Sequence, residues 1–176
     1  RDPEYLHQMR VAVRRLRSVC GAYGKVLPAA ALQPHLCGLR WLAHALGPAR
    51  DADVFVTEIW PPLRAALSAN SSRAWLDAQW AARQRTLFAK ARRALASRRY
   101  QRFVLGFWRQ LAADDWRAGA SAWQLAVLDG AARDFARQVI ERRDGKVRGH
   151  GHALTRLDDV RLHALRIQIK KLRYAA

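Results

Sequence analysis

The first and last parts of the chain carry the same residue pattern. Residues 6–17, LHQMRVAVRRLR, align with residues 162–173, LHALRIQIKKLR, and every position except Gln8/Ala164 and Ala12/Gln168 keeps its chemical type. A repeat of this closeness indicates two copies of one structural unit. It predicts an internal pseudo-two-fold, in which two equivalent helix faces converge on one central groove.

Both copies have the periodicity of an amphipathic helix. Basic residues step by three, four and three positions, which places them within an arc of about 80°. Apolar residues form a second stripe about 100° away. The basic stripes are His7, Arg10, Arg14 and Arg17 in the first copy, and His163, Arg166, Lys170 and Arg173, joined by Tyr174, in the second. The apolar stripes are Leu6, Met9, Val13, Leu16 and Cys20, and Leu162, Leu165, Ile169 and Leu172.

The basic stripes belong to a chain with a large excess of positive charge. It has 32 Lys and Arg against 14 Asp and Glu, a formal net charge of +18. Like charges at these helical spacings oppose folding, so they favour a multivalent anionic partner: nucleic acid, acidic lipid or polyphosphate. Successive stripe residues rise about 5 Å, so each cation reaches a new group along an extended phosphate chain. A solvated helix face is the alternative for either stripe alone, and the duplication favours a ligand site.

Helical periodicity extends through the chain, and no alternating segment predicts a strand. We expect an all-α fold with short connections between antiparallel helices. Asp2 is the expected N-cap of the first helix, and Asp51 that of the third, which is broken or kinked at Pro61-Pro62. Thr155 and Asp158 resemble a capping box that begins the last helix, and a flexible basic loop is expected at 144–153. The expected helices are Pro3 to about Gly21 or Gly24, Leu36 to Gly47-Pro48, one beginning at Asp51, 73–96, 98–113, 119–143, and a final helix through Leu162.

Several features limit the compartment and the chemistry. Cys20 and Cys37 are too few for a disulfide framework, and no stretch approaches eighteen uncharged apolar residues, so we expect a soluble cytoplasmic domain without a membrane partner. Both ends interrupt a helical pattern, as in a piece of a longer protein. A glycine-rich phosphate loop and paired carboxylates on the stripes are missing, so we expect no catalysis and no cofactor. No carboxylate or Cys stands near His150 and His152 at metal-ligand spacing, so no metal site is expected.

Other polar and aromatic residues have competing interpretations. The sequence Arg50-Asp51-Ala52-Asp53 either orients Arg50 toward an anion or is a capped helix start. Most tryptophans, and the lone His35 and His44, are expected to be structural. A second basic region is expected to be solvated, although some of its members could line the groove; it comprises Arg83, Lys90, Arg92, Arg93, Arg98, Arg99 and Arg102.

The chain resembles the CHAD domain family, the helical domains named for conserved histidines. The resemblance rests on His7 to Arg17, on Leu39-Arg40-Trp41-Leu42 followed by residues 46–54, and on Leu162 through Tyr174. It covers essentially the whole chain, although 60–155 matches only in helical character. The resemblance implies a single domain over 1–176, with approximate halves 1–96 and 97–176. Each half is implied to be an antiparallel four-helix bundle, the second incomplete because the chain ends at Ala176.

The resemblance also implies a ligand and a set of site residues. The ligand is inorganic polyphosphate, bound without catalysis, with targeting to polyphosphate granules and a triphosphate-handling domain as a fused or associated partner. The alternative function is that of a nucleic-acid-binding helical domain. If polyphosphate is the ligand, we expect nucleic acid to bind more weakly than polyphosphate. The implied polyphosphate-binding residues are His7, Arg10, Arg14, Arg17, Arg50, His163, Arg166, Lys170, Lys171, Arg173 and Tyr174.

Overall fold

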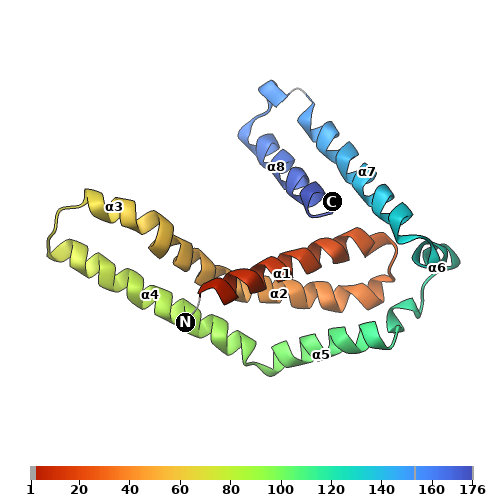
Figure 1. Cartoon of the computed structure of the whole chain (residues 1–176), viewed down its shortest axis with the longest axis horizontal. Helices are drawn as coiled ribbons and strands as arrows, with labels where there is room; N and C mark the ends of the chain where they lie inside the picture. The colour runs from red at the N-terminus through yellow and green to blue at the C-terminus, as the bar shows by residue number, and fades with distance from the viewer. Residues whose placement is uncertain (1–2, 153, 176) are drawn as a thin grey trace. The chain divides into compact units, whose positions relative to one another are not determined.

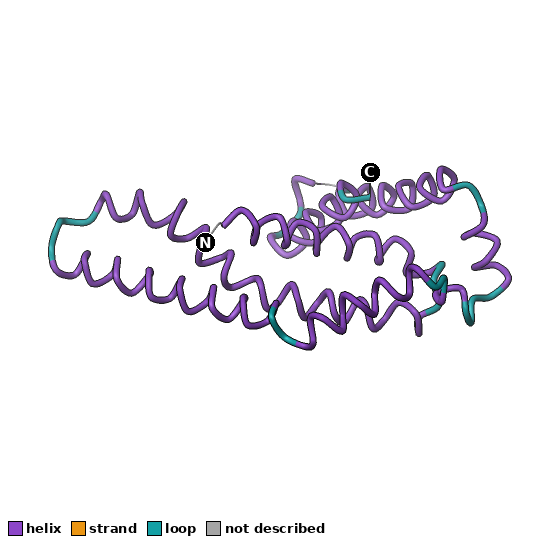
Figure 2. Tube along the Cα trace, turned by 60° about the horizontal axis from the view of Figure 1, so that its bottom comes forward, coloured by secondary structure: helices purple, strands orange, loops and turns teal. Residues whose placement is uncertain are grey.

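The protein is described by a computed structural model that covers residues 3–152 and 154–175. Within these ranges every regular element is a helix, and Figure 2 shows helices joined by short loops with no strand. The predicted all-α class is confirmed, while the expected cap at Asp2 lies outside the described residues. The α-helices, labelled in Figure 1, are α1 (Pro3–Ala22), α2 (Ala29–Val54), α3 (Trp60–Ala66), α4 (Ser71–Leu95), α5 (Arg98–Ala112), α6 (Ala122–Asp129), α7 (Ala132–Gly151) and α8 (Asp159–Arg173).

The helices group into two compact units. Unit 1 comprises the chain up to Arg14 together with His35–Ala112, and unit 2 comprises Arg15–Pro34 together with the chain from Ala113 onward. The long helices α1 and α2 therefore contribute a segment to each unit. The expected halves at 1–96 and 97–176, and the pseudo-two-fold between them, stay predictions.

Helix α2 supplies the best-buried residues of unit 1. Leu39 and Leu46 are fully buried, and Ala49 is 1% exposed. This buried line continues past Gly47-Pro48, where the sequence predicted that the helix would end; that prediction was wrong. A proline inside a helix removes one hydrogen bond and costs about 3 kcal/mol. Burial on both sides of Pro48, whose ring is exposed, keeps α2 helical.

The next segment contains the two adjacent prolines. A π-helical turn, Phe55–Ile59, lies between α2 and α3, and α3 then carries Pro61 and Pro62 in its first turn. Prolines are tolerated there because first-turn N–H groups have no partner within the helix. The chain stays helical through both prolines, so the expected break at Pro61-Pro62 is not observed, and the irregular turn of this segment precedes them. Asp51 does not begin a third helix, because it lies inside α2.

Helices α3 and α4 are held together by a polar contact beside buried indole. Trp60 is 9% exposed, and its Nε1 donates to Asp77 Oδ1 at 2.8 Å. Arg64 Nε donates to both carboxylate oxygens of Asp77, at 3.0 and 2.9 Å. The hydrogen bond from Trp60, followed by that from Arg64, lowers the pKa of Asp77. This contact joins the two helices on either side of the loop at 67–70.

Polar caps separate α4 from its neighbours where the sequence predicted turns. Asn70 Oδ1 accepts the Arg73 N–H at 3.0 Å, which caps the start of α4. Ser97 Oγ accepts the Tyr100 N–H at 3.2 Å and so begins α5. Both boundaries are local, since each depends on one side chain and an N–H three residues away. The predicted breaks at 70–72 and at Ser97 are confirmed.

Gly38 lets α2 approach α5 closely. A Cβ added at Gly38 would lie 2.2 Å from Phe103 Cδ2 and 3.1 Å from its Cγ, so the ring would have to move. We expect Gly38→Ala to lower the free energy of unfolding by about 1–2 kcal/mol, because overpacking outweighs the gain of up to about 1 kcal/mol in helix propensity. Urea unfolding measures this change. The matched control is Gly106→Ala on α5, where a Cβ meets nothing within 4 Å and stability should rise. Equal effects of the two substitutions would contradict the close approach.

The helices of unit 2 differ from the sequence predictions in two places. The predicted helix at 119–143 is interrupted at Gly130 and Ala131, so that α6 and α7 are separate. Residues 144–151, expected to form a flexible loop, instead complete α7, and Ala153 lies outside the described residues. An ion pair between Asp144 and Arg148, at 2.7 Å, stabilises this end of α7 despite its glycines. Helix α8 is capped by Asp158 itself, whose Oδ1 accepts the Arg161 N–H at 2.8 Å, rather than by Thr155.

The tryptophans are less buried than predicted. Among the described residues, Trp60 is the one tryptophan of the core, while Trp75, Trp108 and Trp123 are 60, 67 and 59% exposed. The described helices leave these faces uncovered, because an indole is buried only where a second helix packs against its own side. Cys20 and His35 follow the predictions: Cys20 is 7% exposed, and His35 packs edge-on to Phe107 with centroids 4.9 Å apart. Burial raises the pKa of the Cys20 thiol.

Candidate anion-binding site

The first basic stripe lies on α1 beside a buried apolar stripe. Leu6, Val13 and Cys20 are at most 8% exposed, as predicted. Leu16 is 37% exposed, because the packed surface of α1 is narrower than the predicted stripe. On the basic side Arg14 and Arg17 are exposed, and His7 is half-buried. The helix therefore packs one side and presents cations on the other.

Arg10 differs from the other cations of this stripe because it packs against α2. Its side chain is 25% exposed, and its Nη1 lies 3.1 Å from where a Cβ at Gly47 would be. Its Nη2 lies 3.9 Å from Oδ1 of the exposed Asp51. The glycine leaves room for the guanidinium. Arg10 is thus partly held by unit 1, with part of its surface open to a ligand.

The second basic stripe lies on α8, which packs against α7. Leu165 is 7% exposed, next to Gly151, and it is the buried apolar residue of this helix. Leu162 and Ile169, predicted to be packed, are 41 and 48% exposed. The prediction of a continuous packed stripe was therefore wrong, because α7 covers only a narrow part of α8. The exposed basic residues of α8 are Arg161, His163, Arg166, Lys170, Lys171 and Arg173, of which all but Arg161 lie within the repeat.

Most cations of the two repeats make no ion pair. Among the described residues, no carboxylate lies within ion-pair distance of Arg14 or Arg17, nor of the basic residues of the second stripe on α8; Arg161, which precedes that stripe, lies 3.9 Å from Asp158. Tyr174 is 38% exposed, and its carbonyl accepts a long hydrogen bond of 3.5 Å from Ser18 Oγ on the unit 2 part of α1. Most cations of the two repeats are therefore without a carboxylate partner in the described part of the chain. Their convergence on one groove stays a prediction.

The CHAD sequence profile matches residues 1–176 of the chain. The chain belongs to the CHAD family. The crystal structure of the CHAD domain from the plant Ricinus communis is similar, with 32% sequence identity and a TM-score of 0.67. The match covers 99% of this chain and 54% of the plant chain, so this chain spans about half the length of that relative. Comparison with curated proteins found no match.

Arg50 of this CHAD chain lies inside α2 and is bound to acidic residues. It pairs with the carboxylate of Asp53, which is only 1% exposed, and its Nη2 lies 3.8 Å from Glu58 Oε1. Gln84 Nε2 donates to the other oxygen of Asp53 at 3.4 Å. Of the two interpretations from sequence, the capped helix start is excluded. Arg50 is 22% exposed, so its guanidinium is oriented by Asp53 while part of it faces solvent.

Arg143 on α7 is a candidate residue that the sequence did not single out. Its guanidinium lies beside α1 in unit 2, with Nη2 3.9 Å from where a Cβ at Gly21 would be. The buried Nε has no hydrogen-bond partner among the described residues. Burial, and then the neighbouring Arg142, lower the pKa of Arg143. A partly buried cation without a counter-ion is unfavourable, so an anion bound here would stabilise it. No local pattern could have found it, because its environment depends on the packing of α7 against α1.

Neither a metal-binding cluster nor a membrane-spanning helix is found among the described residues. In the described part of the CHAD chain, no three His, Cys, Asp or Glu side chains lie together where they could hold a metal ion. His150 Nδ1 is instead 2.8 Å from the carbonyl of Lys146 in the same helix. No helix in residues 3–152 and 154–175 has the length and apolar character to span a membrane.

Proposed function

We propose that this CHAD chain binds inorganic polyphosphate through the basic faces of α1 and α8. The proposal is supported chiefly by the exposed cations of both repeats, which lack carboxylate partners in the described part of the chain. An array of unpaired cations is unfavourable until an anion neutralises it. Arg14 and Arg17 on α1, and Arg166, Lys170 and Arg173 on α8, recur at a rise of about 5 Å per step along their helices.

The chemistry of these faces favours phosphate groups in a row. Arginine presents a planar fork of donors that fits two phosphate oxygens, and lysine adds point charges. A single-file stripe fits one extended chain of phosphates and offers no group that reads a nucleobase. The proposed ligand contacts are His7, Arg10, Arg14, Arg17, Arg50, His163, Arg166, Lys170, Lys171, Arg173 and Tyr174, with Arg143 added from the structure.

We further propose that the chain binds polyphosphate without cleaving or transferring it. Phosphoryl transfer needs carboxylates that hold Mg²⁺ beside the phosphates. The buried carboxylate of Asp53 is engaged by Arg50 and Gln84. The proposed role is cytoplasmic targeting of a host protein to polyphosphate granules, with a triphosphate-handling domain as the fused or associated partner.

Competition between polyphosphate and DNA tests the proposed ligand. Long-chain polyphosphate and duplex DNA are titrated into the chain at physiological salt, and binding is followed by calorimetry. We expect submicromolar affinity for polyphosphate and weak DNA binding that disappears as salt rises, because diffuse phosphate contacts are screened. Tighter and salt-resistant binding of DNA would instead support the nucleic-acid alternative. Metal-dependent release of phosphate from polyphosphate would contradict the non-enzymatic role.

A further inference from the structure

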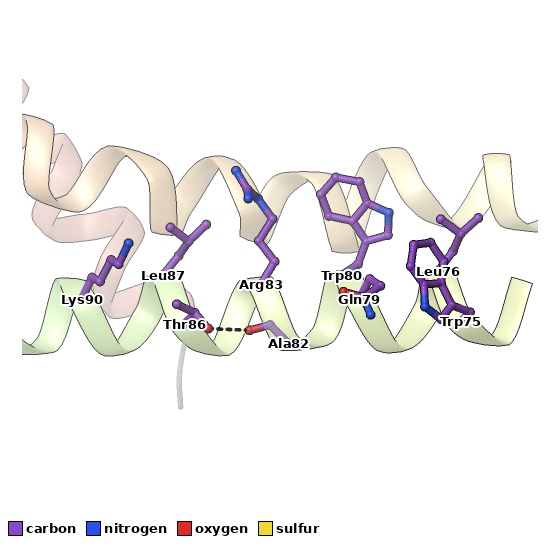
Figure 3. A pocket seen from close by; sticks show the side chains of 9 residues that line it. All are labelled: Trp75, Leu76, Gln79, Trp80, Ala82, Arg83, Thr86, Leu87 and Lys90. Carbon is purple, nitrogen blue, oxygen red and sulfur yellow. Dashed lines mark hydrogen bonds between the residues drawn. The ribbon is translucent and has the colours of Figure 1, made fainter. Parts of the chain in front are cut away.

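A groove along α4 in unit 1 combines aromatic and cationic side chains. Its volume is about 490 Å³, and Figure 3 shows that all the side chains lining it come from α4. Trp75 and Trp80 lie toward the start of the helix, and Arg83 and Lys90 toward its end. The sequence treated these two cations as part of a solvated basic region. The structure places them in the same groove as two indoles.

The aromatic end of the groove offers a surface for stacking. Trp75 is 60% exposed, which leaves its indole available to a ligand. Trp80 is half-buried, and its ring centroid lies 4.0 Å from that of Phe55, so it forms a fixed wall. An exposed indole in the same groove as a fixed one is suited to a planar ring, since aromatic faces attract offset or tilted partners.

The cationic end of the groove offers charge without an internal partner. Arg83 and Lys90 are exposed, and neither forms an ion pair or side-chain hydrogen bond with another described residue. In Figure 3, Arg83 projects to the same side of α4 as Trp80. The helical rise from Trp75 to Arg83 is about 12 Å, and from Arg83 to Lys90 about 10 Å. A ligand lying along α4 would therefore meet an aromatic surface first and two cations after it.

We propose that this groove binds a nucleoside polyphosphate, with the base stacked on Trp75 and the phosphates against Arg83 and Lys90. The two ends of the groove correspond to the two chemical parts of such a ligand. Inorganic polyphosphate would leave the indoles unused, and an apolar compound would leave the cations unpaired. The volume lies within the range of about 300–1,000 Å³ that is typical of small-molecule sites. This site is independent of the proposed polyphosphate faces on α1 and α8.

Calorimetry with ATP and with inorganic tripolyphosphate separates stacking from charge. Base stacking contributes about 1–3 kcal/mol, so Trp75→Ala should weaken ATP binding by about 5- to 150-fold. Binding of tripolyphosphate, which has no base, should be unchanged. Trp108→Ala is the matched control, because Trp108 is an indole of unit 1 that is 67% exposed and lies outside the groove. Circular dichroism verifies that each variant is folded.

A second variant tests the phosphate end. Arg83→Gln should weaken ATP binding by about 10- to 150-fold, since a hydrogen bond to a charged group contributes about 1.5–3 kcal/mol. Arg102→Gln on α5 should have no such effect. The proposal is overturned if Trp75→Ala leaves ATP binding unchanged, or if reversing Arg14 and Arg166 on the basic faces abolishes it. It is also overturned in favour of nucleic acid if a single-stranded oligonucleotide binds more tightly than ATP and depends on Trp75. Polyphosphate binding by Trp75→Ala should be unchanged in every case.

Discussion

Reversing the charge of Arg14 and Arg166 together is expected to lower the affinity for long-chain polyphosphate by at least about 100-fold. Arg14 belongs to the basic stripe of α1 and Arg166 to that of α8, and both are exposed without an ion-pair partner among the described residues. A charge-assisted hydrogen bond contributes about 1.5–3 kcal/mol, so losing two corresponds to about 100-fold or more. Each introduced glutamate adds repulsion. The measurement is calorimetric titration of the Arg14→Glu, Arg166→Glu double variant.

The matched control is the Arg133→Glu, Lys146→Glu double variant. Both of its residues are exposed on α7, and they change the net charge by the same amount. The control should retain most of the affinity, because diffuse attraction between charges separated by more than about 10 Å is screened at physiological salt. The dependence on salt should also become shallower in the stripe variant, because fewer phosphate contacts form and fewer counter-ions are released in total. Equal losses in the two variants would mean that binding depends on net charge alone.

The helices that sequence predicted correctly are those set by local chemistry. Asn70 and Ser97 each mark a helix boundary with one side chain and one N–H, so the sequence contains all the information needed. Pro48 and the glycines of α7 also gave local signals, yet the helices continue through them. At Pro48 the burial of Leu46 and Ala49 overrides the proline. Burial depends on residues that are distant in sequence, so the hydrophobic periodicity of one segment does not predict how deeply that segment is buried.

The candidate site divides in the same way. The basic stripe of α1 could be predicted because the positions on a helix face follow from its period. The packing of α8 could not, since α7 covers Leu165 but leaves Ile169 exposed. Arg143 was missed because its burial arises from the approach of α1, and Trp75 because a typical tryptophan is buried. A local sequence pattern does not show which distant residues pack around a side chain.

Asp53→Ala is expected to lower the free energy of unfolding by about 2–4 kcal/mol. Asp53 is 1% exposed, pairs with Arg50, and accepts from Gln84. Removing one partner of a buried ion pair costs about 3–5 kcal/mol because it leaves the other charge uncompensated. Arg50 is 22% exposed and stays 3.8 Å from Glu58, which reduces that loss. Urea unfolding followed by circular dichroism measures the change.

Asp51→Ala is the matched control for this change, two residues away on the same helix. Asp51 is 76% exposed and lies 3.9 Å from Arg10, a surface ion pair of the kind that contributes about 0–1 kcal/mol. Its substitution should therefore change stability little, while Asp53→Ala should also weaken polyphosphate binding by releasing Arg50 from its orientation. A destabilisation of the same size at both positions would contradict the role of buried Asp53. If stability falls at Asp53 but polyphosphate binding does not, the carboxylate supports the fold of unit 1 and Arg50 is not a ligand contact.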